Sequence, residues 1–142
     1  MQTFLPYASF RKSAQVLDNK RLGKQRVEAL QIMYALTRKE YGWKNHPATK
    51  MWRGCEFLLA CYGLDMCVEW RRRGFRDNCM NKFQTFMRDL PMPPIANPLW
   101  LGDKRLHASH RSNLLRKDAQ FYGQYGWSES DNLAYYWANE TS

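Results

Sequence analysis

The chain has 142 residues, of which 44% are apolar and 15% aromatic, enough for one domain with a substantial core. Its 22 Lys and Arg exceed its 13 Asp and Glu, which gives a net charge of +9 and favours a nucleic-acid partner. No apolar run approaches the roughly 20 residues of a membrane-spanning helix, and the first ten residues do not resemble a secretion signal. These features argue against a membrane or exported protein, so we expect a soluble, cytoplasmic one.

Polar residues mark the start of the first two predicted helices. Ser9 can cap a short helical turn that runs through Leu17. Asp18 is suited to cap a long helix from residue 19 to about residue 38.

A second long helix is predicted after the break in "YGWKNHPAT". Pro47 suits a first helical turn. Apolar residues then recur at three- and four-residue steps and share one face: Trp52, Cys55, Leu59, Tyr62, Met66 and Trp70. Gly74 is suited to a C-terminal cap, so this core-facing helix should end at "RRRGF".

The following segment, residues 76–102, contains four prolines: Pro91, Pro93, Pro94 and Pro98. They exclude a continuous helix and predict a long, partly ordered connection. A last helix is predicted over about residues 104–122, followed by the aromatic tail "FYGQYGWSESDNLAYYWANE". Because no segment alternates with a period of two, the predicted fold class is all-α. We expect a compact single domain over residues 1–142, with a Pro-containing connection and an aromatic C-terminal tail.

The spacing of the four cysteines favours neither a metal site nor disulfides. No pair has the CxxC spacing, and three lie in one helical stretch, where either role is hard to satisfy: Cys55, Cys61 and Cys67. We expect these residues and Cys79 to be reduced thiols with packing roles in a cytosolic compartment.

A single carboxylate, Glu28, lies on a cationic stripe of the first long helix. At 100° per residue, one polar face contains Glu28 and its neighbours Lys20, Arg21, Lys24 and Gln31. The rest of this helix is largely apolar, so the stripe should line a cleft or meet a charged ligand. The alternative is a solvated face on which Lys24 pairs with Glu28. Arg26 falls towards the apolar side, where it would be partly buried, snorkelling or paired.

Two histidines in "HASHRS" are a second candidate site. His107 and His110 lie three residues apart on a predicted helix and, with Asp103 one turn earlier, resemble part of a metal-ligand set. No further ligand appears at a fixed spacing. Contacts to a phosphate or substrate, and hydrogen-bonded structural roles, remain the alternatives.

Five segments occur together in an order that resembles a known family: "DNKRLGKQRVEALQ", "WKNHPATKMWRG", "VEWRRRGF", "LHASHRSNLLRKD" and "AYYWAN". They resemble the pyrimidine dimer DNA glycosylase family, in particular its divergent bacterial and phage branch. The resemblance implies an all-α DNA repair enzyme from a bacterium or phage that acts on double-stranded DNA without a metal or cofactor. We expect it to be a monomer.

The resemblance also implies a mechanism. In that family the α-amino group of the chain attacks the sugar C1′ and forms an imine, and the strand is then nicked at the abasic site. Peptide α-amino groups have a pKa of about 7.7 to 8, which leaves a usable neutral fraction near pH 7. The resemblance assigns the nucleophile to Met1 and the family's glutamate to Glu28. The residues expected to bind DNA are Lys20, Arg21, Lys24, Arg26, Gln31, His46, Arg71, Arg72, Arg73, His107, His110 and Arg111.

Position 2 departs from the family pattern. The bulk of Gln2 should prevent removal of the initiator Met, so either the amine of Met1 is itself the nucleophile or this branch works differently. Two other functions therefore stay open. One is a non-catalytic DNA-binding module, and the other is a metal-dependent nuclease that uses His107 and His110. The sequence does not say which base or lesion is excised.

Overall fold

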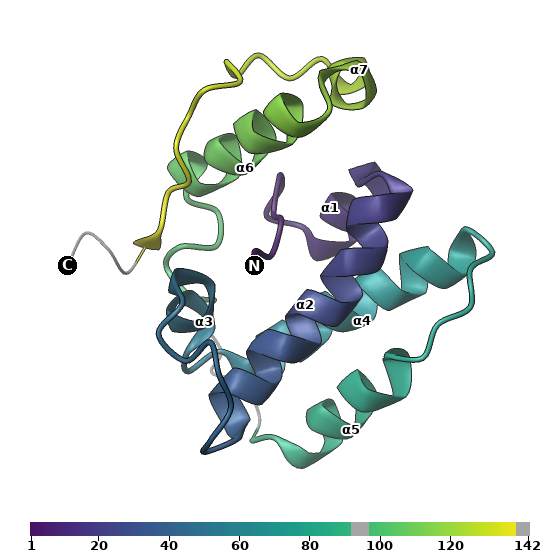
Figure 1. The fold of residues 1–142 in the computed structure, drawn as a ribbon, viewed down its shortest axis with the longest axis vertical. Helices are drawn as coiled ribbons and strands as arrows, with labels where there is room; N and C mark the ends of the chain where they lie inside the picture. The colour runs from purple at the N-terminus through teal and green to yellow at the C-terminus, as the bar shows by residue number, and fades with distance from the viewer. Residues whose placement is uncertain (92–96, 139–142) are drawn as a thin grey trace.

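The computed structural model describes residues 1–91 and 97–138, and every regular element within them is a helix. Figure 1 shows their arrangement. In chain order they are α1 (Phe10–Val16), α2 (Asn19–Thr37), α3 (Pro47–Trp52), α4 (Glu56–Arg72), α5 (Met80–Asp89), α6 (Lys104–Lys117), α7 (Ala119–Tyr122) and the 3-10 turn η1 (Gly123–Tyr125). The predicted all-α fold class is confirmed. None of the described helices is both long and apolar enough to cross a membrane.

The first two helices begin at the predicted caps. The side chain of Ser9 accepts a hydrogen bond from the backbone N–H of Lys12, and that of Asp18 accepts one from the N–H of Arg21. These bonds satisfy backbone donors that have no partner within the first helical turn. The helix that carries Glu28 therefore starts and ends within one residue of its predicted bounds.

The single helix predicted across residues 47–73 is wrong, because α3 and α4 are separate. Gly54 has a left-handed backbone conformation with φ of 85°, which residues other than glycine rarely adopt. The N–H of Cys55 donates to the carbonyl of Trp52 at 2.7 Å and closes the turn. The apolar face continues across this break, because Trp52, Leu59 and Tyr62 are all buried in one core.

The predicted connection over residues 76–102 contains a helix, α5, that the prolines concealed. Pro91 and Pro98 both lie after its last residue, so neither interrupts it. Pro93 and Pro94 lie outside the described residues. Helix α5 packs closely on α4, since a Cβ added at Gly63 would lie 2.3 Å from the ring of Phe83.

The last predicted helix, about 104–122, is divided at Asp118 into α6 and α7. The Asp118 side chain accepts a hydrogen bond from the N–H of Phe121 at 3.0 Å and caps α7. All four cysteines are free thiols, as predicted. Burial raises the pKa of the Cys67 thiol, which keeps it protonated near neutral pH.

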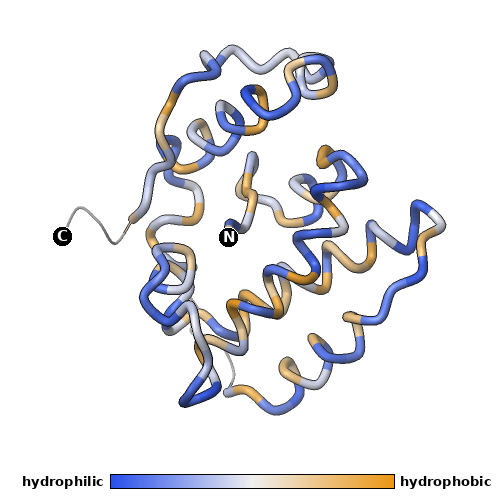
Figure 2. The backbone as a smooth tube through the Cα atoms, in the orientation of Figure 1, coloured by the Kyte–Doolittle hydropathy of each residue, from blue (hydrophilic) through white to orange (hydrophobic). Residues whose placement is uncertain are grey.

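Helices α2 and α4 cross at the centre of the fold (Figure 1), and apolar positions recur along both (Figure 2). Their buried side chains belong to one core, which includes Leu22, Ile32 and Met33 of α2 and Leu59 and Met66 of α4. Seven residues of α2 are buried, whereas Lys20 and Lys24 of its polar stripe are exposed and Arg21, Glu28 and Gln31 are partly exposed.

The N-terminal segment, residues 1–6, lies inside the molecule, between α2 and α6 (Figure 1). Residues 2–6 are all buried. A segment without regular structure needs other partners for its buried backbone groups. Those partners come from α2, α4 and α6, and they hold the start of the chain in place.

Candidate active site

A pocket of about 370 Å³ opens beside the start of the chain. It is lined by Met1, Gln2, Phe4, Lys20, Arg21, Lys24, Gln25, Glu28, Lys117 and Tyr135. The polar stripe of α2 forms one wall, as its position on a largely apolar helix predicted. A second hollow on the same helix is lined by Lys20, Gly23, Lys24, Val27, Glu28 and Gln31. The two pockets share Lys20, Lys24 and Glu28, so Glu28 is reached from both.

Helix α6 holds the N-terminal segment through two histidines on one face. The N–H of Leu5 donates to Nδ1 of His110 at 2.8 Å. Nε2 of His107 accepts from the N–H of Gly102 at 2.9 Å, so the proton of this ring is on Nδ1, which donates to the carbonyl of Leu5 at 2.7 Å. Both backbone groups of Leu5 are therefore satisfied by α6.

Burial keeps both histidines neutral. It lowers the pKa of His107, and it lowers the pKa of the fully buried His110 to about 3. Next to them, Arg111 donates to the carbonyl of Pro6 at 2.7 Å and pairs with Glu129 at 2.8 Å. The structure thus places His107, His110 and Arg111 behind the N-terminal segment and does not bring them into the pocket. The geometry gives no support to their predicted contacts with DNA.

Glu28 is oriented by a buried glutamine. The side-chain amide of Gln25 donates from Nε2 to Oε2 of Glu28 at 2.9 Å. The amide oxygen of Gln25, Oε1, accepts from the N–H of Phe4 at 2.8 Å and lies 2.6 Å from the hydroxyl of Tyr62. Burial raises the pKa of Tyr62 well above 10, so this hydroxyl stays protonated and can donate. The carboxylate and the N-terminal segment are therefore fixed by the same side chain.

The pocket cations differ in how they are paired. Arg21 pairs with Asp18 at 3.2 Å. Burial raises the pKa of Asp18, but hydrogen bonds from Tyr122 and Arg21 outweigh this effect and leave it lowered, so Asp18 is ionised near pH 7. Within the described ranges no salt bridge joins Lys20, Lys24 or Lys117 to a carboxylate. The alternative in which Lys24 pairs with Glu28 on a solvated face is therefore not what the structure shows.

His46 lies close to the N-terminal amine. Its Nδ1 caps α3 by accepting from the N–H of Ala48 at 3.1 Å. Burial and the positive charge of the chain's own amino group lower the pKa of His46. Of the predicted DNA-binding residues, the structure thus brings His46, Lys20, Arg21, Lys24 and Gln31 to the pocket, its neighbouring hollow or the amine.

Arg26 is directed away from this pocket. It forms a salt bridge with Asp77, and its guanidinium lies over the ring of Trp70, 4.5 Å from the ring centre. Only 11% of its side chain is exposed. The sequence prediction of a partly buried, paired arginine is confirmed, whereas the geometry does not support a phosphate contact.

Arg72 and Arg73 are bound to the buried carboxylate of Glu69, at 2.6 Å and 2.8 Å. Arg73 also donates to the side chain of Asn19 and to the carbonyls of Ala14 and Gln15, so it joins α4 to the first two helices. Hydrogen bonds from Arg72 and Arg73 lower the pKa of Glu69 and keep it ionised.

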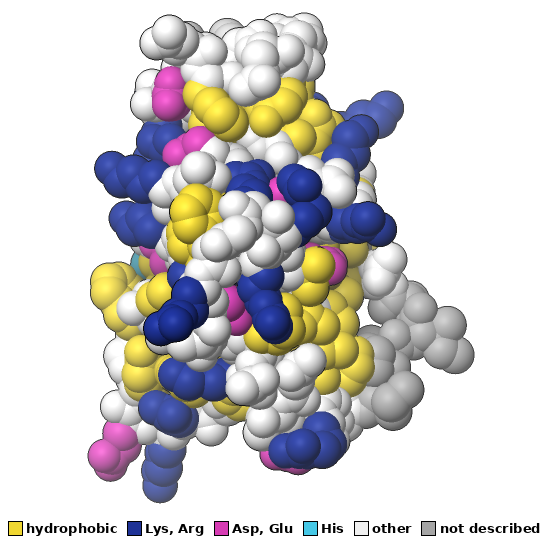
Figure 3. All heavy atoms as spheres, turned by 90° about the vertical axis from the view of Figure 1, so that its right-hand side faces the viewer, with side chains coloured by type: hydrophobic (Ala, Val, Ile, Leu, Met, Phe, Trp, Pro, Cys, Tyr) yellow, Lys and Arg dark blue, Asp and Glu magenta, His cyan; other side chains and the backbone are white. Residues whose placement is uncertain are grey.

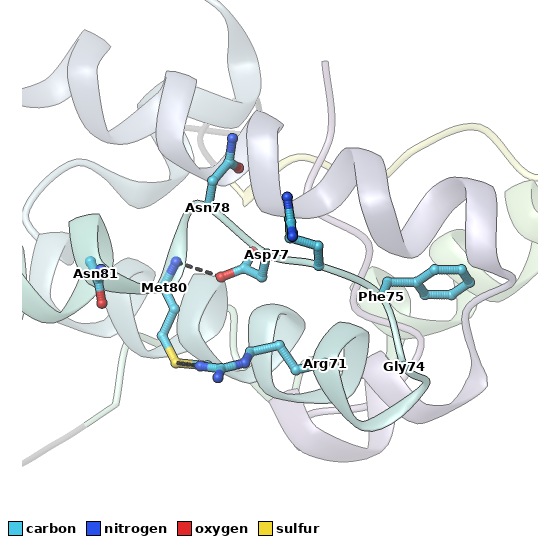
Figure 4. Close-up of a pocket in the computed structure, with 8 residues that line it drawn as sticks. Arg71, Gly74, Phe75, Asp77, Asn78, Met80 and Asn81 are labelled. Carbon is cyan, nitrogen blue, oxygen red and sulfur yellow. Dashed lines mark hydrogen bonds between the residues drawn. The ribbon is translucent and has the colours of Figure 1, made fainter.

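A separate pocket of about 590 Å³ lies between the end of α4 and the start of α5 (Figure 4). It is lined by Arg71, Gly74, Phe75, Arg76, Asp77, Asn78, Met80 and Asn81. Arg71 reaches the sulfur of Met80 at 3.1 Å, and Asp77 accepts from the N–H of Met80 at 2.8 Å. On this side of the molecule, Lys and Arg are dispersed among acidic and apolar side chains (Figure 3). Arg71 therefore lines a different pocket from Glu28.

Five residues that line the pocket were not among the predicted site residues: Gln2, Phe4, Gln25, Lys117 and Tyr135. Gln25 lies three residues before Glu28, a spacing at which side chains on a helix meet, so it could have been found. Lys117 and Tyr135 are more than 85 positions from Glu28, and only folding brings them near it. No cluster of three or more His, Cys, Asp or Glu in residues 1–91 and 97–138 is arranged to hold a metal ion.

Residues 1–83 match the family model described as pyrimidine dimer DNA glycosylase. The matched range includes Met1, Gln25 and Glu28, and it ends before α6. Comparisons with curated proteins and with solved structures find no significant match.

Proposed function

The chain belongs to the pyrimidine dimer DNA glycosylase family, and we propose that it excises a damaged pyrimidine and then nicks the strand at the abasic site. One observation carries the proposal. The buried N-terminal segment brings Met1 into the pocket that Glu28 lines. A nucleophilic amine and a carboxylate in one cationic pocket are the groups that imine chemistry on DNA requires.

In the first step, the nitrogen of the Met1 amine attacks the sugar C1′. A bond forms between this nitrogen and C1′, and the bond from C1′ to the base breaks with its electron pair leaving on the base, which takes up a proton. Positive charge develops on the sugar during this step. The carboxylate of Glu28, held by Gln25 at 2.9 Å, would stabilise that charge.

In the second step, the bond from C1′ to the ring oxygen O4′ breaks with its electron pair leaving on O4′, which takes up a proton, and the C1′ adduct becomes a protonated imine. This group makes the neighbouring C2′ hydrogen acidic. Glu28 would accept the proton, and the 3′ phosphate would leave with the electron pair of its bond to C3′. Water then hydrolyses the imine and restores the free amine.

The pocket cations would hold the DNA backbone. Lys20, Lys24 and Lys117 surround Glu28, and Arg21 is oriented by Asp18. Lysine and arginine contacts to phosphate displace condensed counterions and supply most of the sequence-independent affinity. We propose that these residues place the sugar of the damaged nucleotide next to the amine.

Borohydride trapping tests this function. The protein is incubated with an abasic-site duplex and borohydride, with and without a chelator. A covalent adduct that forms in chelator and maps to Met1 by mass spectrometry is the expected result. Attachment at Lys20 or Lys24 would contradict the role of the α-amine. Nicking that requires metal, or the absence of any product, would contradict the whole proposal.

Two modifications of the amine and one substitution serve as controls in the same assay. Reductive methylation of the amine, or a tag placed before Met1, should abolish trapping while the far-UV circular dichroism spectrum stays unchanged. Gln2→Ala tests the second position, whose side chain is buried and accepts a hydrogen bond from the N–H of Thr3.

A further inference from the structure

Trp43 combines two features that packing does not explain. It is the one residue other than glycine in the described ranges with a positive φ, 69°, a conformation that costs energy for a bulky side chain. Its side chain is also 55% exposed. Residues held in strained backbone conformations cluster at functional sites, so an exposed, strained tryptophan suggests a ligand.

The loop that carries Trp43 is anchored on both sides. The ammonium of Lys44 donates to the carbonyls of Ala35 and Arg38 at the end of α2, the first at 2.8 Å. The N–H of His46 donates to the carbonyl of Trp43 at 3.1 Å, and Arg53 donates to the carbonyl of Lys44 at 3.0 Å. The indole is therefore presented from a supported backbone.

A row of rings connects Trp43 to the candidate active site. The Trp43 ring centre lies 5.8 Å from that of His46, which lies 6.2 Å from Trp137. Trp137 in turn lies 5.9 Å from Tyr135, a residue of the Glu28 pocket. Trp43 thus stands at the outer end of an aromatic row whose inner end reaches the pocket.

The charge around this loop indicates the chemistry of the ligand. Residues 38–53 include the cationic side chains of Arg38, Lys39, Lys44, Lys50 and Arg53 and only one carboxylate, that of Glu40. A flat aromatic surface with cationic neighbours suits a nucleobase attached to a phosphate backbone.

We propose that Trp43 stacks on a DNA base next to the nucleotide held in the Glu28 pocket. Removing a nucleotide from the helical stack exposes the face of a neighbouring base, and an indole can cover that face. This inference rests on the proposed function insofar as it takes DNA to be the ligand. Its test measures binding, so the two can fail independently.

The test compares variants in binding to a duplex that carries one tetrahydrofuran abasic analogue, which cannot form an imine. Trp43→Asn removes the ring and keeps a residue that tolerates positive φ. Trp43→Phe keeps an aromatic face. Val68→Ser is the matched control, because Val68 is 50% exposed on α4. Dissociation constants come from fluorescence anisotropy. A 2-aminopurine placed beside the abasic analogue reports stacking.

We expect Trp43→Asn to weaken binding about ten-fold, the scale of one base stacked on an aromatic side chain, and to lose quenching of 2-aminopurine. Trp43→Phe should retain most of the affinity and most of the quenching. Val68→Ser should leave the affinity and the quenching unchanged. Thermal unfolding should show Trp43→Asn to be no less stable than the wild type.

Unchanged affinity and quenching in Trp43→Asn would overturn the stacking role even if imine trapping succeeds. Trp43-dependent binding without any imine adduct would leave the stacking role standing and contradict the proposed chemistry instead.

Discussion

Two regions of the molecule are rich in basic residues, and they use them differently. Around the N-terminal pocket, Lys20, Lys24 and Lys117 line a cavity with Glu28. At the end of α4, Arg72 and Arg73 are bound to Glu69. In the first region the cations surround a cavity that a ligand can enter. In the second they satisfy a buried carboxylate and join helices, so their charge contributes to folding instead.

The position of the carboxylate accounts for the difference. Glu69 is 4% exposed, and a buried charge must be paired. Glu28 is partly exposed and is held by the neutral amide of Gln25. Its charge is not cancelled by an adjacent cation, so it remains available to a cationic sugar. The predictions below test this contrast.

The largest effect is expected from Glu28→Gln. If Glu28 stabilises the sugar cation and transfers protons, the single-turnover rate of imine trapping should fall about 100-fold or more. DNA affinity should stay near that of the wild type or increase, because a negative charge near phosphates is removed. Full activity in this variant would show that the carboxylate is not catalytic.

A change at the other carboxylate cluster should affect stability instead. Arg73→Ala should lower the free energy of unfolding by about 2 kcal/mol, because Glu69 loses a buried partner. Arg72→Ala is the matched control. Its side chain is 66% exposed, so its loss should destabilise the fold much less than the loss of Arg73. Urea denaturation measures the free energy of unfolding of both variants. Equal losses would contradict the distinction between a buried and an exposed partner of Glu69.

The stability of the fold around the N-terminal pocket should decrease at acid pH, because buried histidines hold the N-terminal segment. Burial lowers the pKa of His110 to about 3, below the value of about 6.5 of an unfolded chain. Between these values the unfolded state binds a proton that the folded state does not, so stability falls as pH falls. The expected loss from His110 alone is about 1.3 kcal/mol between pH 7 and pH 5.5.

His110→Asn checks this assignment. The asparagine can place an oxygen near the position of Nδ1 and accept from the N–H of Leu5, but it does not titrate in this range. Its urea midpoint should therefore depend less on pH than that of the wild type. An unchanged pH dependence would assign the acid sensitivity to other groups.

The smallest effect is expected from Lys24→Ala. Binding to duplex DNA should weaken a few-fold, and the slope of log K against log salt should decrease by about 0.9, the value for one phosphate contact. Arg72→Ala should leave this slope unchanged. If the two variants change the slope equally, the paired arginines also contact DNA.

Local signals predicted much of the fold. Ser9 and Asp18 cap helices where the sequence placed caps, because an N-cap bond depends on residues three positions apart. The division between α3 and α4 was missed, although it depends on one residue, Gly54, with a left-handed backbone. Helix α5 was missed because the four prolines of residues 76–102, which predict an irregular connection, all follow its last residue.

The sequence by itself determined that Glu28 lies on a polar stripe of a largely apolar helix, because helical periodicity depends only on neighbours along the chain. The tertiary structure decided what faces that stripe. Met1 reaches it because His107 and His110, more than 100 residues away, bind Leu5. It also decided which cations remain available, since whether an arginine meets a buried carboxylate depends on packing between elements. A one-dimensional pattern carries no information about such distant partners.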